Sequence, residues 1–351
     1  MFGRFAAVQE LDLLIENGTF VALLGPSGCG KSTTMNMLSG LLEPTRGEIL
    51  FDGEVVNNVK PGDRNVGFVF QNYAIFTHMS AFDNIAFGLK VRKHPVAEIE
   101  HEVKEVARLL GIEEMLQRRP AELSVNDLQK VAIGRSMITK PRIFLLDEPF
   151  SNLDAGFRSY MRAELKKLQR ELAQTMIYVT HDQVEAMSMA EKIAIMDQGR
   201  LQQYGTPDEV FNRPSNRFVA GFVGSTTMNF LPVSLERMGD ALVLTVPLAD
   251  ARLLTVTARG VHGDGGPFTM GIRPEHVALV EPGSDSATLR GTVTLIEALG
   301  PRNIVHLTND AHMLRVTVPP TVRPLVGESV GLALDTGRVH VFDDESGKAL
   351  V

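Results

Sequence analysis

The chain has a single cysteine, no excess of basic charge and no long apolar run. Cys29 alone cannot form an internal disulfide, and scarce cysteine is typical of a reducing compartment. Because 42 acidic residues outnumber 35 basic ones, the net charge of −7 argues against a protein that holds nucleic acid by neutralising phosphates. No apolar run approaches the roughly 18 residues of a membrane-spanning helix, and the first residues lack a signal peptide's apolar stretch. These absences predict a cytoplasmic protein that reaches a membrane only through a partner.

The pattern before residue 224 predicts an α/β domain. A length of 351 residues suits two domains, and ten of the eleven lysines lie at or before Lys192. Helical patterns at 99–110 and 161–168 alternate with short apolar strands. The predicted strands are Phe20–Leu24, Ile143–Asp147, Thr175–Thr180 and Lys192–Asp197. Such alternation indicates a mostly parallel sheet covered by helices, so we place a first domain at residues 1–224.

The pattern after residue 224 predicts an all-β domain. Short segments rich in β-branched residues are separated by clusters of glycine and proline. These segments are Leu242–Val246, Leu253–Thr257, Gly291–Ile296, Asn303–Leu307, Met313–Val318 and Ser329–Leu334. We therefore expect a small barrel at residues 225–351. With one lysine and no conspicuous aromatic platform, this domain gives no reason to expect bound nucleic acid.

A glycine-rich loop lies between the predicted strand Phe20–Leu24 and a predicted helix Lys31–Leu41. Eight residues match the pattern GxxxxGK[ST], namely Gly25, Pro26, Ser27, Gly28, Cys29, Gly30, Lys31 and Ser32, and Thr33 follows them. Only about 0.01 chance matches are expected in such a chain, and the strand–helix context fits the pattern. In such loops backbone N–H groups and the helix N-terminus hold phosphates, while Lys31 would reach the β- and γ-phosphates and Ser32 would ligate Mg²⁺. The sequence therefore predicts a nucleoside triphosphate site.

A second predicted strand, Ile143–Asp147, ends in two carboxylates. It delivers Asp147 and Glu148 to the C-terminal edge of the sheet, where ligands bind in open α/β folds. Beside a phosphate loop, Asp147 would hold Mg²⁺ through water, and Glu148 would orient or deprotonate the attacking water. The pair predicts a hydrolytic centre.

These residues resemble the ATPase subunit of ATP-binding-cassette (ABC) transporters, and the resemblance covers nearly the whole chain. Gln71 resembles the glutamine of the family's Q-loop, and Asp154 resembles the aspartate of its D-loop. His181 resembles the switch histidine that contacts the γ-phosphate. Phe2 stands where the family carries an aromatic residue that stacks on adenine. The resemblance implies ATP and Mg²⁺ as ligands, and it adds Gln71 to the residues around the metal.

The resemblance also implies the architecture and the partners. It implies a P-loop nucleotide-binding domain with a helical subdomain at about 73–140, followed by an oligonucleotide-binding-like (TOBE) regulatory domain. The segments 72–79 and 82–89 resemble the region of importer ATPases that receives the permeases, whereas Phe218–Gly224 and Gly271–His276 resemble the tail of the maltose-type subfamily. We therefore expect integral-membrane permease subunits, a second ATPase subunit and, indirectly, an external solute-binding protein as partners.

The resemblance places the protein on the cytoplasmic face of the cell membrane, as a peripheral subunit. The subfamily imports oligosaccharides, polyols or glycerol phosphate. Because related ATPases serve polyamine, ferric-iron and sulfate importers, the class of solute is inferred only from the similarity of the C-terminal tail to that subfamily. A DNA-repair or ribosome-associated cassette protein is a further alternative, but the long coiled coils, tandem cassettes and basic arms of those proteins are not visible.

Two features depart from the family pattern. Only Met1 precedes Phe2, where the family has about a strand's length of chain, so we expect an edge strand to be missing. A misassigned start codon would explain this, and a truncated, weakly stable domain is the alternative. The second departure lies in the signature loop, where the family has Leu-Ser-Gly-Gly-Gln. Here the corresponding residues after Leu123 are Ser124, Val125, Asn126 and Asp127.

In the family the signature loop grips the γ-phosphate of ATP that the opposite subunit holds. A β-branched Val125 obstructs the close backbone approach that glycine permits, and Asp127 brings a negative charge toward a negative ligand. Ser124 and Asp127 still form a good helix cap, so we expect the helix to form while the grip weakens. This leaves open a homodimer that hydrolyses poorly, a heterodimer with an intact partner, or a subunit that binds ATP without hydrolysing it.

Overall fold

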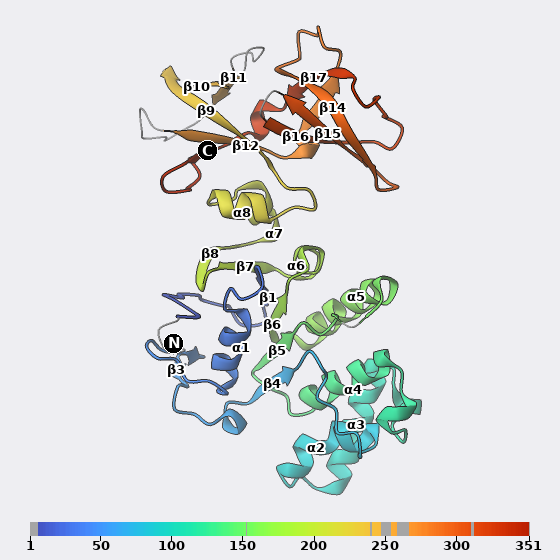
Figure 1. Ribbon diagram of the computed structural model, residues 1–351. Coiled ribbons are helices and arrows are strands. Elements are labelled where there is room, and N and C mark those ends of the chain that lie inside the picture. The colour runs from blue at the N-terminus through green and yellow to red at the C-terminus, as the bar shows by residue number, and fades with distance from the viewer. Residues whose placement is uncertain are drawn as a thin grey trace. The chain divides into compact units, whose positions relative to one another are not determined.

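The computed structural model describes residues 6–151, 153–238, 241–246, 254–257, 267–309 and 312–350 (Figure 1). The chain divides into two compact units, Met1–Asp208 and Glu209–Val351, and each is described by itself. No helix within the described ranges is both long and apolar enough to span a membrane.

The first unit is built on a six-stranded sheet with the order β4-β5-β6-β1-β7-β8. Its strands are β1 (Phe20–Leu24), β4 (Val66–Val69), β5 (Ile143–Asp147), β6 (Thr175–Thr180), β7 (Lys192–Asp197) and β8 (Arg200–Gly205). All neighbours pair in parallel except β7 and β8, which are antiparallel. The four strands predicted from apolar runs are confirmed with the predicted bounds, and the α/β class is confirmed with them.

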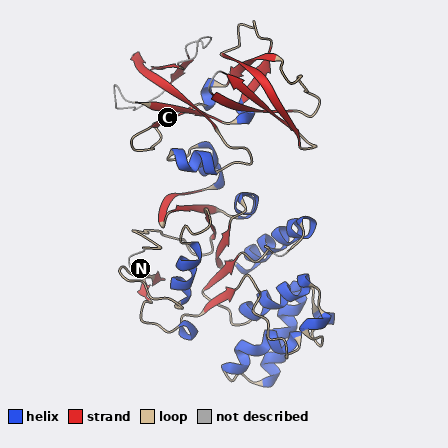
Figure 2. Cartoon of the chain, in the orientation of Figure 1, coloured by secondary structure: helices blue, strands red, loops and turns tan. Residues whose placement is uncertain are grey.

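Helices cover both faces of this sheet, as Figure 2 shows. Along β6, Met176 and Tyr178 pack with residues of α5 (Ala155–Leu172), whereas Ile177 and Val179 pack with residues of α1 (Lys31–Ser39). This alternation follows from the two-residue period of a strand. A further helix, α6 (Gln183–Met189), follows β6, and a two-stranded antiparallel sheet joins β2 (Leu50–Phe51) to β3 (Glu54–Val55).

A group of three helices forms the helical subdomain, within the predicted range of about 73–140. They are α2 (Ala81–Val91), α3 (Val96–Leu110) and α4 (Val125–Met137). In α3, the apolar residues Ile99, Val103 and Val106 recur on one face and are buried against the other two helices. Gly111 ends α3 with a φ of 62° and returns its N–H to the last turn of the helix. The subdomain therefore has its own apolar core.

The second unit contains two five-stranded antiparallel sheets, with the orders β11-β10-β9-β12-β18 and β13-β17-β14-β15-β16. The first sheet holds β9 (Asn229–Met238), β10 (Ala241–Thr245), β11 (Leu254–Thr257), β12 (Phe268–Ile272) and β18 (His340–Asp343). The second holds β13 (Val277–Val280), β14 (Leu289–Ala298), β15 (Asn303–Asn309), β16 (His312–Val318) and β17 (Ser329–Leu334). Both sheets contribute to one apolar core, with Leu231 and Met270 from the first and Val305 and Leu332 from the second. The predicted all-β class is confirmed. Leu253, the first residue of the predicted segment Leu253–Thr257, lies outside the described residues.

The division between the units precedes residue 224, where the sequence predicted the domain boundary. The helices α7 (Pro207–Asn212) and α8 (Arg217–Phe222) lie between the two positions. Ala220 of α8 packs with Phe342 of β18, and the Arg217 N–H donates to the carbonyl of Gly347 at 2.8 Å. These contacts tie α8 to the all-β unit, and the amphipathic pattern of a short helix gives no sign of them.

Arg273 joins the two tail segments that carried the resemblance. Its side chain is 1% exposed and donates to the carbonyls of Phe211 and Val223, each at 2.6 Å. Its guanidinium also stacks over the Phe211 ring, 3.7 Å from the centroid. Burial lowers the pKa of Arg273 to about 10, so the group keeps its charge at neutral pH. A Cβ at Gly224 would lie 2.7 Å from Nη1 of Arg273, which accounts for glycine there.

Replacing Arg273 by alanine should destabilise the second unit. Two buried carbonyls would lose charged donors, and each such hydrogen bond contributes about 1.5–3 kcal/mol. We expect a loss of roughly 3 kcal/mol or more, which lowers the unfolding midpoint of a domain of this size by about 10 °C. Calorimetry should show this shift, whereas Arg290→Ala, at an exposed position of β14, should leave the midpoint nearly unchanged. Equal midpoints for both variants would contradict the role given to Arg273.

Candidate nucleotide site

The phosphate loop connects β1 to α1 and is shaped by its glycines. Gly28 and Gly30 have φ angles of 79° and 104°, a conformation that residues with a Cβ rarely adopt. A Cβ on Gly25 would lie 2.2 Å from the carbonyl oxygen of Met196, and one on Gly30 would lie 2.5 Å from that of Ala7. Because α1 begins at Lys31, the end of the loop is also the N-terminus of a helix. Backbone N–H groups and a helix dipole therefore gather at this loop, as anion binding requires.

Lys31 is the charged group of this loop. Its side chain is only 7% exposed, and Nζ donates to the carbonyls of Gly25 and Pro26 at 2.7 and 2.8 Å. The ammonium therefore lies inside the curve of the loop rather than in solvent. Ser32 is exposed and Thr33 half-buried in the first turn of α1, while the Cys29 side chain is buried beneath the loop.

Asp147 stands at the C-terminal end of β5, between β4 and β6. Burial raises the pKa of its carboxyl, and the neighbouring Glu148 raises it further, while the positive charge of Lys31 opposes both effects. The positive charge of Lys31 thus acts on the pKa of the Asp147 carboxyl. The end of β5 therefore places this carboxylate at the C-terminal edge of the sheet, within reach of the charge of Lys31.

The donors present suit Mg²⁺. Among the described residues no group of three His, Cys, Asp or Glu side chains could hold a metal. Mg²⁺ in nucleotide sites, however, is usually bound by one or two carboxylates together with substrate phosphates and water. The Ser32 hydroxyl and the Asp147 carboxylate are hard oxygen donors of this kind, and the Gln71 amide oxygen is a third. The residues therefore fit a metal held jointly with a polyphosphate.

Glu148 and His181 lie together, although 33 positions separate them in the chain. Oε1 of Glu148 is 3.0 Å from Nδ1 of His181, with Glu148 23% and His181 66% exposed. Glu148 has a φ of 43°, and its N–H donates to the carbonyl of Val179 in β6 at 3.0 Å. A non-glycine residue in this conformation is strained, and such strain gathers at functional sites. The pair combines a carboxylate base with an accessible imidazole at one sheet edge.

A buried polar network lies behind His181, and the sequence did not predict it. Glu185 of α6 is buried and accepts hydrogen bonds from the Tyr178 and Thr180 hydroxyls at 2.6 and 2.7 Å. Thr180 also accepts from the N–H of Asp182 at 2.9 Å, which fixes the chain on both sides of His181. In sequence, Glu185 looks like an ordinary acid in the first turn of a helix, so nothing marks it as buried.

Arg158 links this network to the D-loop. Its guanidinium lies 3.5 Å from Asp182 and 3.9 Å from Glu185, and Nη2 donates to the carbonyl of Leu153 at 3.1 Å. Asp154 caps α5, where its side chain accepts from the N–H of Phe157 at 3.0 Å. The structure thus connects the predicted D-loop to the segment that carries His181.

Gln71 lies two residues beyond the end of the edge strand β4 and is exposed. Tyr73 and Ala74, just beyond it, both have left-handed backbone conformations, with φ angles of 61° and 47°. The loop therefore turns sharply as it leaves the sheet for the helical subdomain. Phe2, the predicted adenine-stacking residue, lies outside the described residues.

The signature loop has the predicted cap. The Ser124 hydroxyl lies 2.6 Å from Oδ2 of Asp127, the Asp127 N–H donates to that hydroxyl at 3.2 Å, and the Ser124 N–H donates to Oδ2 of Asp127 at 3.2 Å. The helix α4 begins directly after Ser124, as expected. The carboxylate of Asp127 therefore engages the hydroxyl and sits at the helix N-terminus, where the family's loop would meet a phosphate, while Val125 is 48% exposed beside it.

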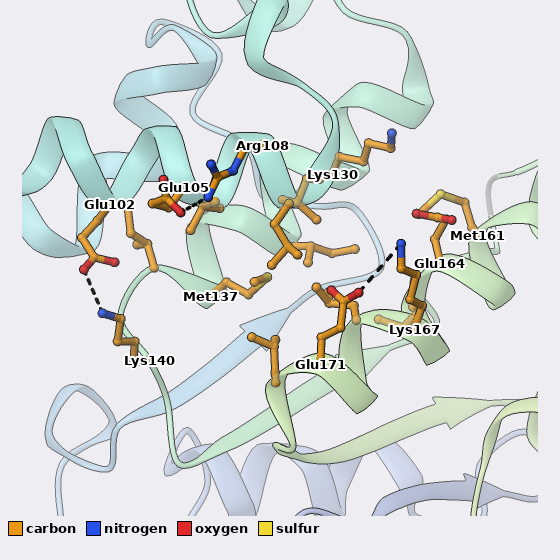
Figure 3. A pocket seen from close by; sticks show the side chains of 18 residues that line it. Glu102, Glu105, Arg108, Lys130, Met137, Lys140, Met161, Glu164, Lys167 and Glu171 are labelled. Atoms are coloured by element: carbon orange, nitrogen blue, oxygen red, sulfur yellow. Dashed lines mark hydrogen bonds and ion pairs between the residues drawn. The ribbon is translucent and has the colours of Figure 1, made fainter.

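A cavity of about 500 Å³ lies between α3 and α4 on one side and α5 on the other (Figure 3). Its walls are apolar, with Ile133, Met137, Leu165 and Leu168 among them. Its rim carries paired charges, namely Lys140 with Glu102, Lys167 with Glu171, and Arg108 with Glu105. An apolar pocket with a balanced rim does not suit a polyphosphate. The nucleotide site is therefore assigned to the loop at β1 and not to this cavity.

Comparison with known families gives three matches along the chain. Residues 8–151 match the family model described as ABC transporter, residues 224–277 match the MalK OB fold domain, and residues 270–342 match the TOBE domain.

Curated relatives align over nearly the whole chain. The trehalose/maltose import ATP-binding protein MalK of Thermococcus litoralis is 46% identical, over 100% of this chain and 97% of its own length. The multiple sugar-binding transport ATP-binding protein MsmK of Streptococcus mutans is 42% identical, over 98% of this chain and 95% of its own. The sn-glycerol-3-phosphate import ATP-binding protein UgpC of Salmonella typhi is 43% identical, over 99% and 96%.

Solved structures match a little more than half of the chain. The protein cbiO1 from Clostridium perfringens, part of the ABC transporter complex cbiONQ, superposes with a TM-score of 0.55 at 31% identity, over 58% of this chain and 83% of its own. A dimeric ATP-binding cassette in a post-hydrolysis state with ADP and phosphate superposes with a TM-score of 0.52 at 30% identity, over 58% and 91%.

Proposed function

The chain belongs to the ATPase subunits of ABC transporters, and from this membership we propose that it drives an importer of a carbohydrate-type solute by binding and hydrolysing ATP. The observation that carries the proposal is the joint position of three groups. The glycine loop holds Lys31, whose positive charge acts on the Asp147 carboxylate at the end of β5, and Glu148, the next residue, lies 3.0 Å from His181.

Each of these groups has a defined task in hydrolysis. The loop N–H groups and Lys31 bind the β- and γ-phosphates and offset their charge. Glu148 orients the attacking water and accepts its proton, while His181 holds the γ-phosphate from the other side. Mg²⁺, held by Ser32, Asp147 and Gln71 together with the phosphates, would supply further charge neutralisation. The network of Glu185 and Arg158 keeps the segment around His181 in place.

Glu148→Gln tests this assignment. The substitution keeps the size of the side chain and a hydrogen-bonding oxygen but removes the base. A positioned base contributes about 10²–10⁴-fold, so turnover of the complex with its permeases should fall at least about 100-fold while Mg-ATP binding persists. Glu171→Gln, at an exposed position of α5 where Glu171 pairs with Lys167, is the matched control. Undiminished turnover in Glu148→Gln would refute the assignment.

The partners follow from the same proposal. The chain would work with integral-membrane permease subunits on the cytoplasmic face of the membrane, paired with a second ATPase subunit. The names of the relatives, two import ATP-binding proteins and one transport ATP-binding protein, support this arrangement. An external solute-binding protein would deliver the solute to the permeases without touching this chain.

The relatives' names also support the solute class, since they name trehalose, maltose, multiple sugars and glycerol 3-phosphate. Vesicles that contain the complete importer should accumulate a labelled sugar or glycerol phosphate when ATP is supplied on the side of the ATPase. Accumulation of a polyamine, ferric iron or sulfate in place of these solutes would contradict the proposal.

A second candidate function is favoured by the signature loop. Because Asp127 engages Ser124 and occupies the start of α4, the loop is poorly suited to hold a second subunit's γ-phosphate. In a homodimer both composite sites would contain this loop and both would be slow. Paired with a subunit of intact signature, this chain would complete one competent site, and the reciprocal site would mainly hold ATP.

A further inference from the structure

One helix, α4, contacts two functional loops. Its N-terminus carries the signature residue Ser124, and Arg135 stands eleven positions further along. At a rise of about 1.5 Å per residue, these positions are roughly 16 Å apart along one rigid element. The Arg135 side chain leaves α4 toward the loop that follows β4, the loop that contains Gln71.

Arg135 holds that loop through two hydrogen bonds. Nη1 donates to the carbonyl of Ala74 at 2.7 Å, and Nη2 donates to the carbonyl of Tyr73 at 2.9 Å. The guanidinium also lies over the ring of Phe76, 5.2 Å from its centroid, and Phe76 contacts Phe87 of α2 with ring centroids 4.6 Å apart. The side chain is therefore fixed by both polar and aromatic contacts.

The two carbonyls belong to the strained part of the loop. Tyr73 and Ala74 are consecutive non-glycine residues in the left-handed region, a conformation that costs about 1–2 kcal/mol for each residue. This left-handed turn at Tyr73 and Ala74, which we call the arch, therefore needs an external contact to persist. The carbonyls of both residues accept from the same guanidinium, that of Arg135. Burial lowers the pKa of Arg135 below its ordinary value, which is the cost of placing a cation there.

We propose that Arg135 is a positioning residue, which holds the loop after β4 in the arch that presents Gln71 and thereby couples the position of the signature helix to that of Gln71. The inference rests on the proposed function for the role of Gln71, whereas the clamp itself rests on the contacts of Arg135. A displacement of α4 carries Arg135 with it, so the arch follows the signature helix or loses its donors.

The contacts require arginine rather than any cation. A guanidinium is a planar fork that donates to two acceptors in a fixed geometry, whereas an ammonium is a point charge on a flexible stem. Arg135→Lys therefore keeps the charge and most of the length but cannot reproduce both hydrogen bonds. Arg108→Lys is the matched control, because Arg108 lies on α3 in the same subdomain and is exposed with Glu105 as its partner.

Hydrogen exchange of the full chain without nucleotide tests the clamp directly. The N–H groups of Tyr73 and Phe76 donate to the Phe70 carbonyl and to Oδ1 of Asn84, each at 2.9 Å, so they report on the arch. In Arg135→Lys these amides should exchange at least about tenfold faster than in the control Arg108→Lys. The exchange rates of the β1 amides and the melting temperature should be the same in both variants. Unchanged exchange at Tyr73 and Phe76 would overturn the proposal.

Turnover of the assembled transporter tests the coupling to Gln71. Arg135→Lys should raise the Mg²⁺ concentration for half-maximal hydrolysis by about tenfold, with a melting temperature equal to that of the control. An unchanged Mg²⁺ dependence together with accelerated exchange would overturn the link to Gln71. If the unmodified complex shows no hydrolysis, the proposed function fails, whereas the exchange measurement still decides the clamp.

Discussion

Restoring the signature loop with Val125→Gly, Asn126→Gly and Asp127→Gln should raise ATP turnover of the homodimeric complex at least about tenfold. The substitutions free the Ser124 hydroxyl, which lies 2.6 Å from the Asp127 carboxylate, and remove the β-branched side chain beside it. They also remove a negative charge that would face the γ-phosphate. At about 6 Å and an effective dielectric constant of about 20, that repulsion is roughly 3 kcal/mol, and exposure to solvent reduces it.

Asp127→Asn separates the two causes. Asparagine keeps an oxygen that can accept from the Ser124 N–H, so α4 should remain capped while the charge disappears. We expect a partial gain from this single change and a larger gain from the triple change, measured as turnover of the complex with its permeases. Equal turnover in the unmodified and triply substituted complexes would show that the loop does not limit hydrolysis.

Lys31→Ala should reduce the affinity of the isolated subunit for Mg-ATP at least about 100-fold. The ammonium of Lys31 is the positive side chain placed inside the loop, where it now bonds the carbonyls of Gly25 and Pro26. A charge-assisted hydrogen bond to phosphate is about twice as strong as a neutral one, so its loss removes a large share of the binding free energy. Titration calorimetry measures the effect, with Lys104→Ala on the surface of α3 as the control. Equal affinities for the two variants would show that the loop is not the nucleotide site.

The strands of the first unit could be predicted because burial on both faces makes them continuous apolar runs. Phe20–Leu24 and Thr175–Thr180 are buried along their whole length, and the sequence shows them plainly. The edge strands were missed for the opposite reason. Arg200–Gly205 is a polar strand at the end of the sheet, and Val66–Val69 contains a glycine. In the second unit the sequence predicted the all-β class, but it did not predict the strands β9, β12, β13 and β18.

The site could be predicted where its chemistry is carried by neighbours in the sequence. The loop from Gly25 to Thr33, the acidic pair after β5 and the cap formed by Ser124 with Asp127 are local patterns, and the structure places each at the end of the predicted element. Arg135 was missed because its partner Ala74 lies 61 positions away, and Arg158 and Glu185 were missed because their contacts join different elements, α5, β6 and α6. Nothing in the residue types around them distinguishes them from ordinary helix-surface charges.

A mixed dimer tests the central claim, that this chain supplies one sound half-site and one impaired half-site. One copy keeps its own signature loop, the other carries the Gly-Gly-Gln restoration, and separate tags isolate the mixed pair with its permeases. The only competent site then combines the P-loop and Glu148 of the unmodified copy with the restored loop. We predict that Glu148→Gln abolishes hydrolysis when placed in the unmodified copy and leaves most of it when placed in the restored copy. Equal losses from the two placements would contradict the account.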